Sequence, residues 1–360
     1  MIKNLSIKNF KLFNNIEIKN ISQFTLIGGK NNVGKTSLME AMFMLFDKGR
    51  PDITIRNHHA RGITNFSFTP EYIFEPIFNS FDIDNSIEIQ ANFKNIQRSL
   101  NIEKITKSNI SISIEDNKLN QNTNISQQAN SNIMLQALSL IFKDNDKITE
   151  QSILSLYPEL GLKIIETKPN DNFRVGVINS RTISHQNTNS ENVGNLIKDK
   201  KLDILLHILQ IIAPEIKNIQ SISIPNNNSI LHVDIGKSKL IPLAFMGDGV
   251  NRLLNIIATM YLCQNGILFI DEIENGLHYS VIKDIWKGII QAGKKFKCQI
   301  IATTHSDEFL RLSNEAMQEE NLQKQDFSYL KLERRGDEVR IGEFDYELFD
   351  YAIDNGREVR

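Results

Sequence analysis

The chain has 360 residues, of which 41% are hydrophobic and 23% are charged. These proportions are ordinary for a globular protein, and the length suffices for two lobes or for one domain with an insertion. A formal net charge of −2 provides no overall attraction to nucleic acid, so that any contact with DNA must come from a local patch. We expect a cytoplasmic protein that does not enter a membrane, because no apolar run approaches roughly 18 residues and the N-terminus lacks the apolar core of a signal peptide.

The N-terminal region predicts a hairpin followed by a strand, a loop and a helix. The stretch LSIKNFKLFNNIEI alternates apolar and polar residues around a turn at Asn14-Asn15, as β-hairpins do. In the following FTLIGGKNNVGKTSLMEAMFMLF, residues 24–27 are apolar, residues 28–34 are rich in glycine, and residues 35–46 carry apolar side chains at helical spacing.

The middle of the chain mixes strand and helix patterns with two polar stretches. The runs SIEIQANF and ISISIE within residues 70–115 predict a small antiparallel sheet. Residues 120–132 and 185–195 are polar without periodicity and predict exposed loops. Leucines at three- and four-residue spacing predict a helix over 196–212, and two short alternating runs, IQSISI and ILHVDI, follow it.

The C-terminal region alternates helices with uninterrupted apolar strands. A helix over 250–262 precedes the strand GILFI, and a helix over 281–293 precedes the strand CQIIATT. A hairpin from about residue 328 and a short last helix complete the chain. Such alternation predicts an α/β fold with a parallel sheet covered by helices on both faces. Cys263 and Cys298 have no partner at metal-ligand spacing and are expected to be buried free thiols.

The segment Gly29–Thr36 reads GKNNVGKT and fits the pattern G-x-x-x-x-G-K-[ST] between a predicted strand and a predicted helix. Glycines let the loop wrap closely enough for backbone N–H groups to point at phosphates. Lys35 can then reach the β- and γ-phosphates, the Thr36 hydroxyl can bind Mg²⁺, and the start of the helix adds its positive dipole end. The segment predicts a phosphate-binding loop.

Two further strand ends carry candidate catalytic residues. ILFIDEIEN places Asp271 and Glu272 at the C-terminal edge of the sheet, where α/β sheets bind ligands. Alone, such a pair is more often a solvated strand end; with the phosphate loop, we expect Asp271 to hold the metal ion and Glu272 to orient or deprotonate the attacking water. His305 follows the strand in ATTHSDE and is expected to contact the γ-phosphate, although a lone histidine is usually a surface or core residue. We expect ATP rather than GTP, because no Asn/Thr-Lys-x-Asp element is present.

The stretch LAFMGDGVNRLL (243–254) places Gly247 and Gly249 around Asp248, directly ahead of an apolar helix. By itself it is a loop that ends in a helix start. The order GKNNVGKT, GDG, LFIDEIENGLH and TTHS, however, resembles the ABC-type ATPase heads of the RecF, SMC and OLD group. It is most similar to the stand-alone, OLD-like AAA15-type ATPases of bacteria, which have no Toprim domain.

This resemblance covers residues 1–50 and 240–310 well. It implies a P-loop NTPase fold of the ABC-ATPase head type, with a mixed central sheet, helices on both faces, a small antiparallel sheet and a compact, mainly helical insertion. The implied segments are an N-terminal lobe over 1–85, the strands and insertion over 86–235, and a C-terminal lobe over 236–360. Residues 86–235 lack sustained heptads and are too short for the coiled-coil arm of SMC proteins.

The resemblance also implies a role for each matching residue. The nucleotide contacts are Gly29, Asn31, Asn32, Gly34, Lys35, Thr36 and Ser37 of the Walker A loop, and Gly247, Asp248 and Gly249 of the signature loop of a second copy. Thr36 and Asp271 bind Mg²⁺, and Glu272, His305 and Lys35 are catalytic. The usual signature serine falls on Gly247, so backbone N–H groups and the helix start must replace its hydroxyl. The Q-loop residue is expected between about Phe66 and Phe81.

In this group of proteins, ATP closes head-to-tail dimers, so we expect a homodimer or higher homo-oligomer. Too few residues follow HSDE for a Toprim domain, and we therefore expect no nuclease activity in this chain. The implied function is ATP hydrolysis that regulates a separate effector, such as a Toprim- or HNH-type nuclease, or a DNA transaction, in anti-phage defence.

Two alternatives remain open. One is a RecF-like repair ATPase that binds DNA without an effector, through Lys3, Lys8 and Lys11 or through Lys294, Lys295 and Lys297. For these lysines an ordinary solvated face is the simpler interpretation. The other is a small-molecule kinase, which leaves Glu272 beside Asp271 and the following ENGLH unexplained.

Overall fold

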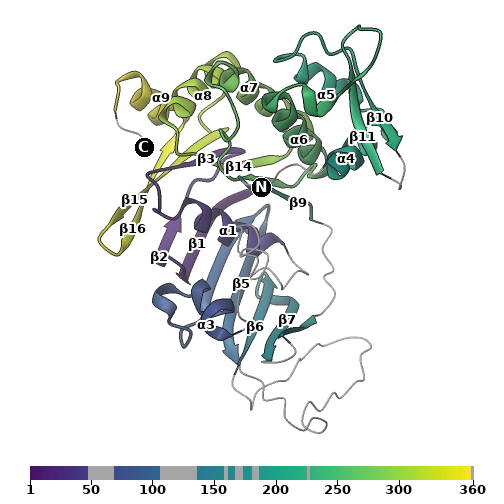
Figure 1. Cartoon of the computed structure of the whole chain (residues 1–360). Helices are drawn as coiled ribbons and strands as arrows, with labels where there is room; N and C mark the ends of the chain where they lie inside the picture. The colour runs from purple at the N-terminus through teal and green to yellow at the C-terminus, as the bar shows by residue number, and fades with distance from the viewer. Residues whose placement is uncertain are drawn as a thin grey trace. The chain divides into compact units, whose positions relative to one another are not determined.

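The computed structural model describes residues 1–47, 69–105, 136–157, 161–166, 173–180, 186–224 and 228–357. The chain forms two compact units (Figure 1). Unit 1 contains Met1–Asn4, Ile18–Phe43 and Asn172–Arg360, and unit 2 contains Leu5–Glu17 and Met44–Asp171. These units cut across the three consecutive segments that the sequence suggests. In the described part of the chain, no helix is long and apolar enough to cross a membrane.

Unit 1 is built on a six-stranded sheet of mixed direction. Its order is β16 (Glu338–Asp345), β15 (Phe327–Arg335), β3 (Phe24–Gly28), β14 (Gln299–Thr303), β13 (Ile267–Ile270) and β9 (Val175–Ile178). The strands from β15 to β9 are parallel, and only the edge strand β16 runs antiparallel to its neighbour. Every residue of β3, β13 and β14 is buried, which explains their continuous apolar sequences. The expected α/β fold with a mixed sheet is confirmed.

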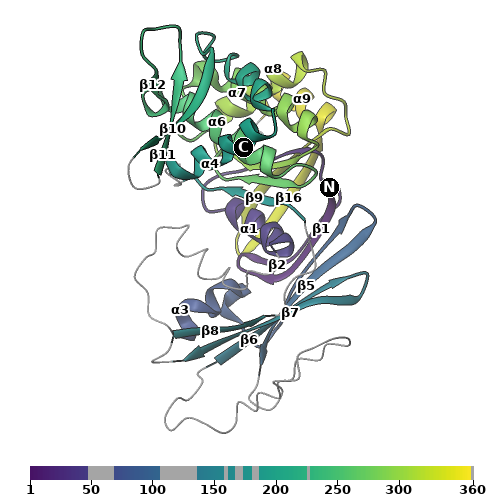
Figure 2. The same cartoon turned by 90° about the vertical axis from the view of Figure 1, so that its right-hand side faces the viewer.

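Helices lie on both faces of this sheet (Figure 2). The sheet-covering elements are α1 (Lys35–Phe46), α6 (Asp248–Leu262), α7 (Tyr279–Phe296), α8 (Asp307–Glu319) and α9 (Tyr346–Asp354). Leu268 and Ile270 of β13 belong to the core that α6 and α7 complete. Because side chains alternate along a strand, Phe269 points to the opposite face of the sheet. There the centre of its ring lies 6.0 Å from the centre of the Phe43 ring of α1. On the α7 face, the fully buried Trp286 packs edge-on against Phe24 of β3.

A second part of unit 1 departs from the sequence-based expectation. Residues 185–195, expected to be an exposed loop, lie mostly in α4 (Gln186–Lys198), and the helix expected over 196–212 is instead α4 followed by the short α5 (Leu202–Leu209). The buried side of α4 includes Ser190, whose hydroxyl donates to the backbone oxygen of Ser229 at 2.9 Å. A helix that buries small polar residues gives no apolar periodicity, which is why its sequence resembles a loop.

The two alternating runs after α5 form a small antiparallel sheet, as expected. Its order is β10 (Asn218–Ile224), β11 (Asn228–Asp234) and β12 (Ile241–Pro242), and the short turn η3 (Leu243–Phe245) then leads into α6. Val233 on β11 is fully buried and belongs to the same hydrophobic core as α6 and α7.

Unit 2 is dominated by a seven-stranded sheet. Its order is β2 (Phe13–Ile18), β1 (Ile2–Phe10), β4 (Ile87–Phe93), β5 (Ile96–Ile105), β6 (Gln136–Asp144), β7 (Lys147–Tyr157) and β8 (Gly161–Glu166). Each strand from β4 to β8 pairs antiparallel with its sequence neighbour. Three short turns of helix, α3 (Pro70–Ile73), η1 (Glu75–Ile77) and η2 (Asn79–Phe81), precede β4.

Unit 2 therefore differs from the compact, mainly helical insertion that was expected within 86–235. The antiparallel sheet predicted from residues 70–115 is present through β4 and β5 and extends further, to β8. The first hairpin turns at Lys11, whose φ is 49°, and not at Asn14-Asn15, which lie inside β2. Residues 106–135, which contain ISISIE and the polar stretch 120–132, lie outside the described residues, as do residues 66–68 of the interval expected to hold the Q-loop.

A buried ion pair stabilises the interior of unit 2. Arg98 on β5 donates from Nε and Nη2 to the two carboxylate oxygens of Asp144 on β6, at 2.8 and 3.0 Å. The guanidinium group also lies 5.3 Å from the ring centre of Phe46 and 5.8 Å from that of Phe93. Two parallel hydrogen bonds and two aromatic faces compensate for removing this charge from water.

Candidate nucleotide site

The predicted phosphate loop joins β3 to α1 within unit 1. Gly29 has a φ of 136°, and a Cβ atom there would lie 2.4 Å from the backbone oxygen of Leu332, so this position requires glycine. The Lys35 ammonium group donates to the backbone oxygens of Gly29 and Lys30 at 2.7 and 2.8 Å. These bonds turn the side chain back across its own loop, where it is able to meet a phosphate held by the loop.

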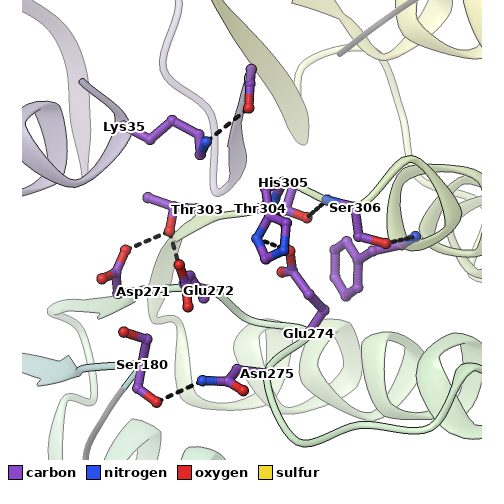
Figure 3. A network of polar contacts seen from close by, with 12 residues as sticks. Lys35, Ser180, Asp271, Glu272, Glu274, Asn275, Thr303, Thr304, His305 and Ser306 are labelled. Atoms are coloured by element: carbon purple, nitrogen blue, oxygen red, sulfur yellow. Dashed lines mark hydrogen bonds and ion pairs between the residues drawn. The ribbon is translucent and has the colours of Figure 1, made fainter. Parts of the chain in front are cut away.

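The loop and the acidic strand end are joined by hydrogen bonds to one carboxylate. The Thr36 hydroxyl donates to Oδ1 of Asp271 at 3.2 Å. The Thr303 hydroxyl donates to the same oxygen at 2.6 Å (Figure 3). Asp271 is only 8% exposed. The structure thus brings together Thr36 and Asp271, residues 235 positions apart in the chain that the sequence predicts to share a metal ion.

Glu272 has an unusual backbone conformation beside this carboxylate. Its φ of 46° lies in the left-handed region, which residues other than glycine adopt only when their surroundings hold them there. The Glu272 backbone N–H donates to the Thr303 hydroxyl at 2.8 Å. Thr303 therefore binds the Asp271 carboxylate as a donor and the Glu272 backbone N–H as an acceptor, and it connects the two adjacent acidic residues to β14.

His305 is paired with Glu274, a carboxylate for which the sequence predicted no role. Glu274 Oε1 accepts from the His305 backbone N–H at 2.7 Å and lies 3.0 Å from His305 Nδ1 (Figure 3). The Glu274 side chain is 9% exposed, whereas that of His305 is 43% exposed. The two contacts hold the imidazole ring from its Nδ1 side and leave the Nε2 edge directed away from Glu274.

Arg252 is the basic residue that sequence reasoning missed. It lies on α6, one helical turn beyond Asp248, and its Nη2 lies 3.4 Å from the backbone oxygen of Asp271 and 3.3 Å from that of Glu272. Burial lowers the pKa of Arg252, while the charges of Asp271, Glu274 and Glu272 act in the opposite direction. No signal in the sequence pointed to it, because Arg252 stands at helical spacing from Asp248 and Asn255, as a residue of a polar helix face does.

The predicted signature loop is the N-terminal boundary of α6. Gly247 caps the helix with φ 86° and ψ 160°, a conformation that is essentially restricted to glycine. No side chain caps the first turn, so its backbone N–H groups are not used by a capping residue. A Cβ atom on Gly249 would meet only Val281 and Ile285 of α7, at 3.7 and 4.0 Å. Gly249 therefore lies beside α7, whereas a Cβ atom on Gly247 would meet nothing within 4 Å.

The remaining predicted residues occupy the same loop and helix start. Asn31 and Asn32 are exposed, Asn32 with a φ of 63°, and Ser37 lies in the first turn of α1 with 9% exposure. The donor set of the site, a hydroxyl group and carboxylate oxygens beside a glycine-rich loop, is the kind that Mg²⁺ and phosphates require. The residues present fit a magnesium–nucleotide complex.

A glycine-rich loop between a buried parallel strand and a helix, joined to an acidic strand end, is the arrangement of a P-loop nucleotide-binding protein. Residues 1–310 match the model of the AAA_15 family, described as AAA ATPase domain. The chain belongs to this family and is an ATPase of this type.

The chain is also similar to one curated relative and to several solved structures. It is 26% identical over 348 residues to an ATP/GTP phosphatase of Helicobacter pylori, with 90% of each chain covered. Among solved structures, it is similar to an SMC head bound to the C-winged helix domain of ScpA, with a TM-score of 0.48, 12% identity, and 96% of this chain and 97% of that chain covered. The SMC head domain from Thermotoga maritima gives a TM-score of 0.44 with 11% identity, over 95% of this chain and 98% of that chain.

Proposed function

We propose that this protein binds ATP with Mg²⁺ in the site around Lys35 and Asp271 and hydrolyses it to ADP and phosphate. The observation that carries the proposal is the shared oxygen of Asp271, which accepts hydrogen bonds from Thr36 of the phosphate loop and from Thr303 of β14. These three side chains come from distant parts of the sequence, and their convergence at the C-terminal edge of the sheet gives the site its chemistry.

Each residue has a distinct part in the proposed reaction. Bound Mg²⁺ withdraws charge from the phosphate oxygens. The backbone N–H groups of residues 29–34 and the Lys35 ammonium hold the phosphates, and Thr36 and Asp271 hold the metal ion. Glu272, fixed at its left-handed φ by Thr303, orients a water molecule and accepts its proton. His305 lies beyond the end of β14 and donates a hydrogen bond to the γ-phosphate from Nε2.

The glycine pair before α6 suggests how hydrolysis is coupled to assembly. In the proposed mechanism, Gly247–Gly249 of one copy completes the nucleotide site of a second copy, with the uncapped N–H groups of α6 in place of a serine hydroxyl. ATP then favours the closed dimer, because only that state contacts the nucleotide from both sides. The proposed output of closure is control of a separate nuclease effector in anti-phage defence, which rests on family analogy.

The test uses Glu272→Gln, which removes the base and keeps the side-chain size. The variant is expected to bind ATP with unchanged affinity, to hydrolyse it at least about 100-fold more slowly, and to give an ATP-dependent dimer in size-exclusion chromatography with light scattering. Glu338→Gln, on the 78%-exposed Glu338 of β16, is the matched control and should behave like the wild type. Wild-type turnover in the Glu272→Gln variant would refute the assignment.

The nucleotide and the partner need separate measurements. GTP is tested beside ATP, because the Helicobacter pylori relative is named an ATP/GTP phosphatase, whereas this sequence lacks a guanine-reading element. For the effector, co-purification of the native complex is the direct assay. DNA cleavage by the pure chain that is lost in Glu272→Gln would contradict the proposal of a separate nuclease.

The alternative is a DNA-binding repair ATPase, and at least two of the six lysines that suggested it have partners within the chain. Lys8 forms an ion pair with Glu88 at 3.0 Å, and the Lys294 ammonium donates to the backbone oxygen of Glu320 at 3.2 Å. ATP-dependent DNA binding that weakens steeply with salt would favour this alternative over the effector proposal.

A further inference from the structure

Arg252 occupies a place that the proposed reaction does not explain. It is carried by α6, the helix that begins at the glycine pair, yet its guanidinium group lies against the backbone oxygens of Asp271 and Glu272 at the end of β13. A single side chain therefore joins the loop that is proposed to contact a second copy with the two residues that are proposed to bind the metal ion and activate water.

The buried position of Arg252 costs free energy of folding, which indicates that the side chain does more than stabilise the fold. Its Nε is buried and has no hydrogen-bond partner in the described part of the chain, and the same holds for Oε2 of the neighbouring Glu274. A buried donor without an acceptor destabilises the fold, because it has given up its hydrogen bonds to water without replacement. The two polar atoms also belong to one electrostatic group, because Arg252 interacts with the charges of Asp271, Glu272 and Glu274.

We propose that Arg252 is a positioning residue for hydrolysis: its guanidinium group holds the backbone oxygens of Asp271 and Glu272, and so transmits the position of α6 to Glu272. The inference rests on the proposed function. Nη2 fixes the peptide oxygens on both sides of the strained Glu272 backbone.

A positioning role predicts a different kinetic result from a structural one. Arg252→Met keeps a long apolar side chain but removes the planar guanidinium group, with its hydrogen-bond donors and its charge. We expect the affinity for a fluorescent ATP analogue to stay within twofold, while kcat falls roughly 10- to 100-fold, since small errors in placing a catalytic group have effects of this size. Arg252→Lys restores the charge without the planar fork, so its kcat should lie between those of Arg252→Met and the wild type.

A double variant separates action through Glu272 from general damage. If Arg252 acts through Glu272, adding Arg252→Met to Glu272→Gln should cause no further loss of kcat beyond about twofold. Multiplied losses in the double variant, or a parallel loss of ATP affinity and kcat in Arg252→Met, would show a merely structural role and overturn the inference. Arg340→Met, on the 62%-exposed Arg340 of β16, is the matched control and should leave kcat unchanged.

The same assay distinguishes failure of the proposed function from failure of the inference. If the wild type shows no turnover of ATP, or if Glu272→Gln turns over normally, the proposed function fails and the inference fails with it. If wild type and Glu272→Gln behave as expected but Arg252→Met hydrolyses ATP at the wild-type rate, the inference alone is wrong.

Discussion

Replacing Thr303 by valine would test the geometry of the site most directly. The Thr303 side chain is 1% exposed, donates to Oδ1 of Asp271 at 2.6 Å and accepts from the Glu272 backbone N–H at 2.8 Å. Valine has nearly the same shape and suits a buried strand, so the substitution removes both hydrogen bonds without opening a cavity. The substitution therefore measures the contribution of the Thr303 hydroxyl group separately from that of packing.

The expected magnitude follows from the two bonds. A buried hydrogen bond to a charged group contributes about 1.5–3 kcal/mol, and one between neutral groups about 0.5–1.5 kcal/mol. We therefore expect Thr303→Val to lower the free energy of unfolding by about 2–4 kcal/mol. It should also lower kcat by roughly tenfold or more, because Glu272 loses the bond that holds its left-handed backbone.

The assay is urea unfolding followed by tryptophan fluorescence, combined with steady-state ATP hydrolysis. Trp286 is the only tryptophan of the chain and is fully buried in unit 1, the unit that contains Thr303, so its emission reports unfolding of this unit. The change in the urea midpoint at constant slope gives the difference in the free energy of unfolding.

Thr25→Val is the matched control. Thr25 on β3 is also fully buried, donates to the backbone oxygen of Ser22 at 3.1 Å and lies 2.9 Å from the Ser328 hydroxyl, away from the acidic pair. Its substitution should lower stability by about 1–3 kcal/mol with kcat unchanged. If Thr303→Val loses less than about 1 kcal/mol and keeps the kcat of Thr25→Val, the role assigned to the Thr303 hydroxyl is refuted.

Three further predictions use other parts of unit 1. Lys35→Ala should abolish ATP binding in a fluorescence titration while the urea midpoint stays close to that of the wild type, and retained affinity would contradict the loop assignment. Gly249→Asp meets no steric obstacle, since a Cβ atom there makes only contacts of 3.7 Å or more. It should bind ATP normally but fail to dimerise or hydrolyse it, because a carboxylate would face the phosphates of the second copy; an ATP-dependent dimer would show that the glycine pair is not at the interface. Finally, burial raises the pKa of the Cys263 thiol to about 12 and that of Cys298 even further, so both stay protonated at pH 8. Ellman's reagent should label neither cysteine in the native protein and both in urea, and rapid labelling before unfolding would contradict their burial.

The local part of the site could be predicted from the sequence. The phosphate loop and the acidic strand end are encoded by short segments, in which glycine, lysine and carboxylate residues stand at the spacing that phosphate and metal binding require. The structure places both segments at strand ends, as expected. The buried, unpaired state of Cys263 and Cys298 is also confirmed. The predicted roles of all the site residues, those of Lys35, Thr36 and Asp271 included, stay predictions.

What the sequence could not reveal depends on contacts between distant residues. Thr303 looks like any residue of a buried strand, and Arg252 like a helix surface position, until folding brings them to the acidic pair. The boundaries of the two units were also not visible in the sequence, because β9 (Val175–Ile178) follows unit 2 in the chain and yet pairs in the sheet of unit 1. Helix α4 shows a further limit, since its buried serine and asparagine lack the apolar periodicity that predicts a helix.

The strand order of unit 1 has a consequence for synthesis. Strand β3, which carries the phosphate loop, lies between β14 and β15, so both of its sheet neighbours are made long after it. About 275 residues separate Gly28 from Thr303. At a synthesis rate of about 5–20 residues per second, the ribosome needs roughly 14 to 55 seconds to add them. During that time β4 to β8, each paired with its sequence neighbour, have every partner they need. A nascent chain therefore completes its nucleotide site only after β14 and β15 have been made, well after the strands of unit 2.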